Sequence, residues 1–277
     1  MSLRHIPDSF SAPVVAAIDE RLSSVEAEHE VRIALAIESG SRAWGFPSPD
    51  SDYDCRFVFI RPVEQYLSPW VRRDVIETPL DAVLDVNGWD LGKALKLLLK
   101  GNAVIIEWLR SPLVYRGDAG FRDEMLAFAT EFADRDLIAR HYLHLGERQR
   151  HTYFGDGKDV ALKKIFYALR PAATLRWLRL RPGEAIAPMH FPTLMASCEP
   201  PADVVAVVSD LMARKAQTRE LGSAPLPEPI HAFMDTEFDL ARIAFEKGPV
   251  RLSADAVAAA EVLFRRHAWH LGSQAAK

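Results

Sequence analysis

Four residues near the start of the chain have types and spacing that suit chemistry on phosphates. The segment ESGSRAWGFPSPDSDYD, residues 38–54, joins two hydrophobic runs. Gly40 and Ser41 follow the first run, where a glycine lets the backbone approach a ligand and a serine hydroxyl can bond phosphate oxygens. Asp52 and Asp54 open the second run, and residues i and i+2 of a strand project from the same face. We therefore expect two carboxylates side by side, opposite a phosphate-binding turn.

Neighbouring carboxylates repel each other unless a cation neutralises them or one of them stays protonated. Oxygen ligands favour a hard cation such as Mg²⁺, which one or two carboxylates usually hold together with substrate phosphates. Two ions at roughly 3.5–4 Å from each other require at least one more acid. Asp85, an acid on an otherwise apolar strand, is the predicted third ligand. Asp90 competes with it, although a helix N-cap explains Asp90 without a metal, and Glu77 is a lesser candidate.

The elements around these residues predict a small mixed sheet. The chain has 277 residues, of which 49% are hydrophobic, so it can bury a substantial core in one large domain or two smaller ones. Residues 13–30 have helical spacing, and 31–39 and 53–60 have the composition of strands. Two more short strands are expected within 74–89, joined near 78–81. Asp50 lies in the turn before the second strand, where Ser, Pro and Asp are ordinary turn formers.

From Asp90 onwards the pattern becomes helical. A helix is expected from Asp90 as N-cap to Gly101, and a second short helix ends before Pro112. Further helical periods cover 118–133, 135–152, 158–180, 201–219, 228–246 and 253–270, with proline-rich loops between them. We therefore predict an α+β protein, with an N-terminal α/β domain over residues 1–117 and an all-helical domain over 118–277.

Charge is distributed unevenly along the chain. The net charge is −4, which argues against indiscriminate coating of nucleic acid, yet residues 135–183 hold eleven Lys or Arg against four acids. This segment can form a basic wall for a polyanion, or simply a solvated helix face. Within it, Lys163, Tyr167 and Arg170 share one helix face at spacing i, i+4, i+7 and could line a triphosphate. Lys164 is expected to point elsewhere, and Pro171 to end or bend the helix.

Cysteine content and hydropathy indicate the compartment. Cys55 and Cys198 are the only cysteines in the sequence, which excludes a disulfide framework and a four-cysteine zinc site and suits a reducing compartment. The chain shows no signal peptide and no apolar run near the roughly 20 residues that span a bilayer. We expect a soluble, cytoplasmic protein that does not enter a membrane.

The order of strand, Gly40-Ser41, ten residues, and Asp52-Tyr53-Asp54 on the next strand resembles the signature of the DNA polymerase beta nucleotidyltransferase superfamily. The strings ESGSRAWGF, SDYDCRF, NGWDLGKALKLLLKGN and KKIFYALRPAATLRWL look like a bacterial and phage family of predicted nucleotidyltransferases, some of them associated with RNA repair. These blocks cover roughly residues 36–180.

The resemblance implies transfer of a nucleoside monophosphate from an NTP to an acceptor hydroxyl, with release of pyrophosphate. Gly40 and Ser41 would hold the triphosphate, and Asp52 and Asp54 would coordinate Mg²⁺ or Mn²⁺. Asp85 would complete the second metal site and take the proton of the acceptor hydroxyl. Arg42 could contact phosphate, and Trp44 could either stack on a base or pack in the core.

Three functions remain open on the sequence alone. The leading one is a metal-dependent nucleotidyltransferase that acts on an RNA end, because the basic segment would attract a phosphate chain. The second is transfer of the nucleotide to a protein hydroxyl. The third is a nucleotide-binding sensor that uses the same pocket without turnover, although the presence of all three acids counts against it.

Overall fold

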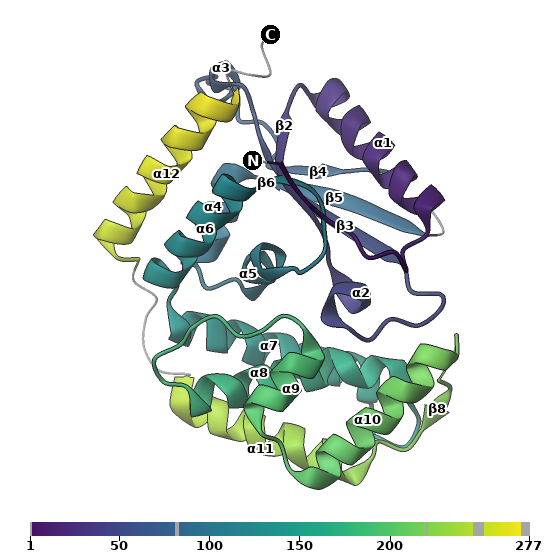
Figure 1. Ribbon diagram of the computed structural model, residues 1–277. Coiled ribbons are helices and arrows are strands. Elements are labelled where there is room, and N and C mark those ends of the chain that lie inside the picture. Colours follow the sequence, from purple (N-terminus) through teal and green to yellow (C-terminus); the bar gives the residue numbers. More distant parts are fainter. Residues whose placement is uncertain (1, 81–82, 220, 246–251, 273–277) are drawn as a thin grey trace.

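The computed structural model describes residues 2–80, 83–219, 221–245 and 252–272. A six-stranded mixed sheet forms the upper part of the molecule, with the strand order β1-β6-β2-β3-β5-β4 (Figure 1). Its strands are β1 (Ser2–His5), β2 (Arg32–Glu38), β3 (Tyr53–Ile60), β4 (Val75–Glu77), β5 (Leu84–Asp90) and β6 (Val114–Asp118). The pair β3 and β5 is parallel and the other four pairs are antiparallel. The predicted mixed sheet is confirmed.

Sequence patterns identified four of the six strands of the sheet. The predicted strands at 31–39, 53–60 and 74–89 correspond to β2, β3 and the pair β4 and β5, while β1 and β6 were not predicted. The turn expected near 78–81 lies partly outside the described residues. The strand β6 is a short run between the helix that was expected to end before Pro112 and the helix expected from residue 118, and it was assigned to neither.

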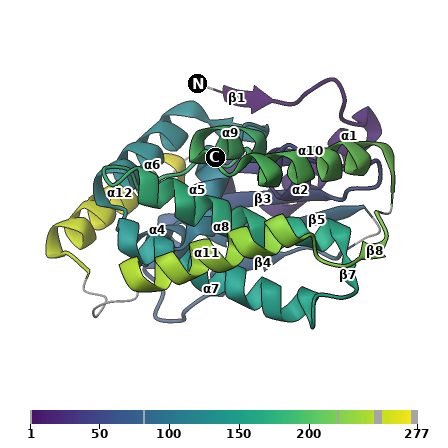
Figure 2. The same ribbon diagram turned by 90° about the horizontal axis from the view of Figure 1, so that it is seen from below.

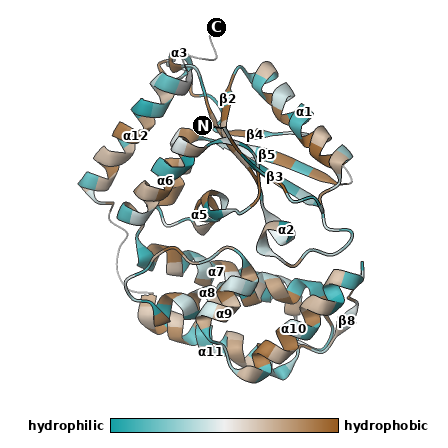
Figure 3. Cartoon of the chain, viewed as in Figure 1, coloured by the Kyte–Doolittle hydropathy of each residue, from teal (hydrophilic) through white to brown (hydrophobic). Residues whose placement is uncertain are grey.

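Helices cover both faces of the sheet (Figure 1). On one face, α1 (Ala12–His29) packs Ile18, Leu22 and Val25 into a cluster with Phe57 and other side chains of β3. The opposite face is covered by α4 (Leu91–Leu99), α5 (Ala103–Arg110), α6 (Ala119–Phe132) and α12 (Ala254–Gly272). Figure 3 shows hydrophobic stretches along β3 and alternating hydrophobic and hydrophilic stretches along α12, as an amphipathic helix requires.

A layer of helices lies below the sheet (Figures 1 and 2). Its central helix, α8, contacts α7, α9 and α11. The bounds are α7 (Arg135–Phe154), α8 (Ile165–Leu180), α9 (Phe191–Cys198), α10 (Ala202–Gln217) and α11 (Glu228–Phe245). Short elements also occur in this layer: β7 (Val160–Ala161) pairs with β8 (Ser223–Ala224), and the 3₁₀ turn η1 (Leu162–Lys164) precedes α8. The short helix α3 (Val63–Tyr66) follows β3 and lies near α12, away from this layer (Figure 1).

Several expectations about this layer need correction. Residues 158–180 do not form one helix, because β7 and η1 occupy the first part. Pro171 was expected to end or bend its helix, and it does not end α8, which continues to Leu180. Most of α8 is buried among its neighbours, and this packing outweighs the loss of one backbone hydrogen bond at the proline. The stretch predicted as a proline-rich loop also contains the start of α9, at Phe191.

The sheet and the helical layer share one hydrophobic core. The same buried cluster contains Leu35 and Val58 from the sheet, Leu98 from α4, and Leu169 from α8. Both α6 and α12 follow residue 117 in the chain and pack beside the sheet rather than in the lower layer. The division into 1–117 and 118–277 remains a prediction, and the helices that lie below the sheet are α7 to α11.

Candidate active site

The Gly40-Ser41 turn is clamped to the strand that carries the aspartates. It forms a one-turn helix, α2 (Gly40–Trp44), whose first residue has a φ of +64°, a conformation that glycine adopts without strain. The backbone N–H of Ser39 donates to the carbonyl oxygen of Asp54 at 2.8 Å. A Cβ atom added at Gly40 would lie 2.1 Å from Oδ2 of Asp54. Glycine is therefore required here both for the backbone angle and for the close approach to a carboxylate.

Three serines fix the loop between α2 and β3. The hydroxyl of Ser41 donates to Oγ of Ser51 at 2.9 Å, and the backbone N–H of Ser48 donates to the same oxygen at 2.8 Å. Ser48 and Ser51 also contact each other through their hydroxyls at 3.0 Å. The loop thus places several hydroxyl groups beside the Gly40 turn, as a phosphate-binding surface requires.

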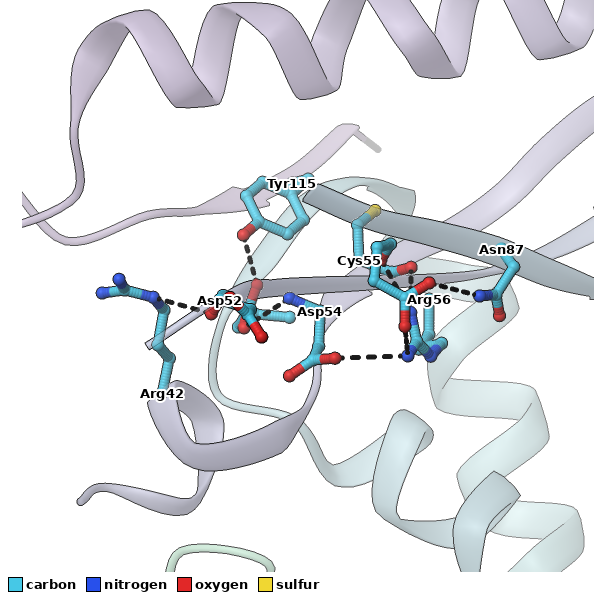
Figure 4. A network of polar contacts seen from close by, with 9 residues as sticks. Arg42, Asp52, Asp54, Cys55, Arg56, Asn87 and Tyr115 are labelled. Carbon is cyan, nitrogen blue, oxygen red and sulfur yellow. Dashed lines mark hydrogen bonds and ion pairs between the residues drawn. The ribbon is translucent and has the colours of Figure 1, made fainter. Parts of the chain in front are cut away.

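Asp54 and Asp85 are direct register partners on the parallel strands β3 and β5. Arg56 lies two residues beyond Asp54 on the same face and donates to Oδ1 of Asp54 at 3.2 Å and to Oδ2 of Asp85 at 2.6 Å (Figure 4). Asp52 precedes β3 and is exposed. Burial raises the pKa of Asp54, Arg56 lowers it, and the nearby carboxylates of Asp85 and Asp52 raise it further. The negative charge of Asp54 is therefore under-compensated by its protein neighbours.

A fully buried acid on the neighbouring strand holds the backbone of Asp54. Glu38, at the end of β2, is inaccessible to solvent. Its Oε1 accepts a hydrogen bond from the backbone N–H of Asp54 at 3.1 Å, and its Oε2 accepts one from the hydroxyl of Tyr115. Burial raises the pKa of Glu38 to about 8, although both hydrogen bonds oppose this shift. Glu38 and Tyr115 were not among the predicted site residues.

The aspartates and the turn open into a cavity of about 390 Å³ between the sheet and the helical layer. Its lining includes Gly40, Ser41, Asp52 and Asp54 on one side and the cations Lys163, Lys164 and Lys215 on the other. Trp44 and Tyr167 also line it, with their rings edge to face at a centroid distance of 6.1 Å. A cavity that is lined by carboxylates beside the sheet and by ammonium groups from the helical layer suits a metal-bound polyphosphate.

The lysines of this cavity differ partly from those that the sequence indicated. Lys163 and Tyr167 line the cavity as predicted. Lys164 was expected to point elsewhere, and this was wrong, because both lysines belong to the 3₁₀ turn η1 rather than to a regular helix. The ammonium group of Lys164 lies 4.8 Å from the ring centroids of both Tyr153 and Tyr167.

Lys215 reaches the cavity from α10. Its side chain is buried, and its ammonium group donates to the carbonyl oxygen of Phe46 at 2.7 Å. Burial lowers the pKa of Lys215 to about 8, partly offset by Asp50, which also lines the cavity. Lys215 is thus a cation of reduced proton affinity that lines the same cavity as the aspartates.

Two predicted nucleotide-binding residues lie outside the described lining of this cavity. Arg42 donates to the carbonyl oxygens of Ser51 at 2.5 Å and Asp52 at 3.1 Å, with its guanidinium 3.8 Å from the ring centroid of Tyr53. Arg42 therefore holds the backbone of the loop that carries Asp52. Arg170 is buried and pairs with Glu107 at 2.7 Å. Its guanidinium lies 4.0 Å from the ring centroid of Trp44, so it supports a residue that does line the cavity.

Much of the positive charge in residues 135–183 is used inside the helical layer. Arg176 and Arg179 both pair with Glu237 of α11, at 2.8 and 3.0 Å, and Glu237 is almost fully buried. Arg140 donates to the carbonyl oxygen of Phe245 at 2.6 Å. The charge asymmetry of the sequence therefore reflects internal ion pairs in large part, and the members of this segment that reach the cavity are Lys163 and Lys164.

The competing acids have other tasks. Asp90 caps α4 by accepting a hydrogen bond from the backbone N–H of Gly92 at 2.8 Å, and it also accepts one from the hydroxyl of Tyr66 at 2.9 Å. In the parallel register it lies opposite Phe59, five positions along the strand from the Asp54 and Asp85 pair. Glu77 pairs with Arg73 at the surface. Asp85 is the acid that the fold places beside Asp54.

The donor set fits one divalent ion better than two. Asp52 and Asp54 offer carboxylate oxygens at the cavity, and magnesium is commonly held by such a pair with substrate phosphates. Asp85 is held by Arg56, and no group of three or more His, Cys, Asp or Glu side chains within the described residues is arranged to hold a metal.

Comparison with known proteins defines the class and then the family. A strand, a Gly-Ser turn and paired aspartates on the next strand, with helices around a mixed sheet, are the arrangement of the polymerase beta nucleotidyltransferase superfamily. The chain matches the family described as "RNA repair pathway DNA polymerase beta family" over residues 14–266 and belongs to that family. The Bacillus subtilis (strain 168) protein named "Uncharacterized protein YcgL" is 38% identical to this chain over 222 residues. The aligned part covers 80% of this chain and 84% of that protein. Across the described part of the chain, no helix is long and apolar enough to span a membrane.

Proposed function

We propose that the protein is a metal-dependent nucleotidyltransferase that moves a nucleoside monophosphate from an NTP to a hydroxyl at an RNA end and releases pyrophosphate. The observation that carries this proposal is the pair Asp52 and Asp54, which lines one cavity together with a glycine-serine turn and with lysines from the helical layer. Membership of an RNA repair family supports RNA, rather than a protein, as the acceptor.

The residues of the cavity divide the task between them. Ser41 and the amides of the Gly40 turn would bind the phosphates, and Lys163, Lys164 and Lys215 would neutralise the terminal ones. Asp52 and Asp54 would hold one Mg²⁺ or Mn²⁺. Such an ion, when bound, neutralises charge that develops on the phosphates. Trp44 and Tyr167 offer aromatic surface to the nucleoside.

In the transfer step, the acceptor hydroxyl oxygen forms a bond to the α-phosphorus while the bond from that phosphorus to pyrophosphate breaks. The hydroxyl proton must leave at the same time, and Asp85, beside Asp54, is the proposed acceptor of that proton. Arg42 and Glu38 act indirectly, because they hold the backbone of Asp52 and Asp54 respectively. We also propose a cytoplasmic location, in keeping with the two free, buried cysteines.

A non-catalytic nucleotide sensor is the second candidate. It is favoured by one observation: Asp85 is held by Arg56 and does not join the other two acids in a three-ligand group within the described residues. A sensor would bind NTP in the presence of Mg²⁺ and release no pyrophosphate.

The test uses the full chain with each NTP labelled at the α-phosphate, Mg²⁺ or Mn²⁺, and RNA whose 3′ end carries either a hydroxyl or a phosphate. We expect label on the hydroxyl-ended RNA, and none with the Asp52→Asn/Asp54→Asn variant. The matched control is Asp210→Asn/Asp239→Asn, which removes two charges from surface ion pairs of α10 and α11.

Unchanged transfer by the Asp52→Asn/Asp54→Asn variant would exclude the proposed metal ligands. Metal-dependent NTP binding without any pyrophosphate release would support the sensor instead. Transfer to both RNA ends at equal rates would exclude the terminal 3′ hydroxyl as acceptor.

A further inference from the structure

Arg56 bridges the carboxylates of Asp54 and Asp85. Figure 4 shows its guanidinium directed at Asp54. One guanidinium nitrogen, Nη2, contacts both acids, at 3.2 Å to Asp54 and 2.6 Å to Asp85. The other, Nη1, donates to the carbonyl oxygens of Cys55 at 3.1 Å and Asp85 at 2.7 Å. The guanidinium is therefore held at four points, and its side chain is only 16% exposed.

The two acids are held unequally. Both carboxylate oxygens of Asp85 accept hydrogen bonds from protein side chains, Oδ2 from Arg56 and Oδ1 from the amide of Asn87 at 2.7 Å (Figure 4). Asp54 receives the longer contact from Arg56 through Oδ1, while its Oδ2 lies against the backbone of Gly40. Asp85 is thus engaged on both oxygens, whereas Asp54 is engaged more weakly.

The cavity lining includes one part of this cluster and not the other. Asp52, Asp54 and Arg56 line it, and Asp85, whose side chain is 34% exposed, is absent from its lining among the residues that the structure describes. A cation in the cavity therefore lies beside Asp52, Asp54 and the Arg56 guanidinium rather than beside Asp85. Because a guanidinium stays protonated in proteins, this positive charge persists at any physiological pH.

We infer that Arg56 is the resident counter-cation of Asp85: the free protein binds one divalent ion on Asp52 and Asp54, and Asp85 becomes available only when Arg56 releases it. This inference rests on the proposed function. A second ion between Asp54 and Asp85 would have to replace a guanidinium that already contacts both acids, since two cations cannot share that space.

Nucleotide phosphates are the chemical group suited to draw Arg56 away. Arginine matches the geometry of phosphate with two parallel N–H donors, and Arg56 already lines the cavity proposed for the triphosphate. A phosphate that engages Arg56 would leave Asp85 with its Asn87 contact and an unpaired oxygen. Asp85, the acid proposed to accept the hydroxyl proton, would thus be released only when a nucleotide is bound. The acceptor hydroxyl would then not lose its proton before the NTP is in place.

The experiment measures Mn²⁺ binding without nucleotide, from the electron paramagnetic resonance signal of free Mn²⁺, with the full chain at neutral pH. The variants are Arg56→Met, Asp85→Asn and their combination. Arg116→Met is the matched control, because Arg116 is also a strand arginine paired with an acid, Glu26, away from the cavity.

We expect Asp85→Asn to leave Mn²⁺ binding of the otherwise unchanged protein within about twofold, because Asp85 is not yet a ligand. Arg56→Met should bind Mn²⁺ at least about tenfold more tightly, or bind one further ion, because the variant removes a positive charge that repels a cation on these carboxylates. Adding Asp85→Asn to Arg56→Met should abolish that gain, and Arg116→Met should bind as the unchanged protein does.

Two results would overturn the inference: a clear loss of Mn²⁺ binding on Asp85→Asn alone, or identical binding by Arg56→Met and the unchanged protein. If Arg56→Met fails to fold, as judged by circular dichroism, Arg56→Gln keeps hydrogen-bond donors without the charge and should show the same gain. Mn²⁺ binding that survives Asp52→Asn/Asp54→Asn would instead refute the metal ligands of the proposed function, so the two failures are distinguishable.

Discussion

Gly40 and Asp54 lie so close together that no side chain fits between them. A Cβ atom at position 40 would lie 2.1 Å from Oδ2 and 2.9 Å from Cγ of Asp54. The turn that would bind phosphates and the carboxylate that would bind the metal are therefore built as one unit, and neither can move without the other.

Gly40→Ala should abolish nucleotide transfer while the protein still folds. The alanine would push the Asp54 carboxylate out of place, and a displacement of about 1 Å can lower a rate about 100-fold. The left-handed backbone at residue 40 adds a cost of about 1–2 kcal/mol. Gly222→Ala is the control for this backbone cost, since Gly222 has a φ of +71° and, among the residues that the structure describes, nothing lies within 4 Å of the added methyl group. Equal activity of the two variants would contradict the contact.

Lys215→Met should weaken NTP binding more than NMP binding. The lysine reaches the cavity from α10, and its ammonium group is proposed to contact the terminal phosphates. A hydrogen bond to a charged group is worth about 1.5–3 kcal/mol, which predicts roughly a 10- to 100-fold weaker NTP. Isothermal titration with NTP and NMP measures this difference. Lys100→Met, an exposed lysine at the end of α4, serves as the control; an equal loss for NTP and NMP would contradict the assignment.

Binding of NTP should also weaken as the pH rises through about 8. Burial lowers the pKa of Lys215 to about 8, so the free protein loses this positive charge above that pH, while NTP requires it. Lys215→Arg should bind NTP with less dependence on pH, because arginine stays charged. The ratio of the two affinities, measured between pH 7 and 9, removes the contribution of the nucleotide itself. A constant ratio would show that Lys215 does not titrate in this range.

Local sequence patterns were sufficient for the turn and the aspartate strand. The glycine, the serine and the alternating acids of residues 40–54 lie within one hairpin, and the period of a strand places Asp54 on a known face. The same period could have identified Arg56, which lies two residues further along that face. Glu38 opens the very segment that suggested the site, but its side chain projects into the buried side of the sheet, which the pattern of a fully buried strand does not reveal.

The helical side of the site could not be predicted in the same way. Lys215 lies on an amphipathic helix whose pattern shows only that one face is buried, and its contact with Phe46 joins residues 169 positions apart. The i, i+4, i+7 spacing placed Arg170 with Lys163 and Tyr167, but the 3₁₀ turn η1 changes the register ahead of α8. Glu107, which pairs with Arg170, comes from a helix beside the sheet. Such pairings depend on how layers pack.

Arg170→Met should destabilise the fold rather than act directly on nucleotide binding. The buried carboxylate of Glu107 would lose the hydrogen bond from Arg170 and keep the one from the Tyr142 hydroxyl at 2.9 Å. Removing one partner of a buried ion pair costs about 3–5 kcal/mol. Denaturant unfolding measures this loss. Lys163→Met, on the cavity, should change the unfolding free energy by less than about 1 kcal/mol and weaken NTP binding instead. The reverse pattern would restore Arg170 as a direct nucleotide ligand.

Glu38→Gln should remove the pH dependence of stability that the buried carboxyl of Glu38 causes. Burial raises the pKa of Glu38 from 4.5 to about 8 in the folded protein. Between these values the folded chain keeps a proton that the unfolded chain releases, so the unchanged protein loses stability as the pH rises from 4.5 to about 8. This group contributes at most about 1.4 kcal/mol per pH unit. The glutamine variant has no such proton, so its stability relative to the unchanged protein should rise through this window and level off outside it.

Denaturant unfolding at several pH values, with a chelator present so that no ion binds Asp54, measures this difference. Glu261→Gln, at an exposed site of α12, is the control and should show no such trend. A difference between Glu38→Gln and the unchanged protein that is the same at every pH would mean that Glu38 is ionised throughout the range. In that case the hydrogen bonds from Tyr115 and from the backbone of Asp54 would outweigh its burial, and Asp54 would rest on a permanent negative charge, which would strengthen its need for a cation on the cavity side.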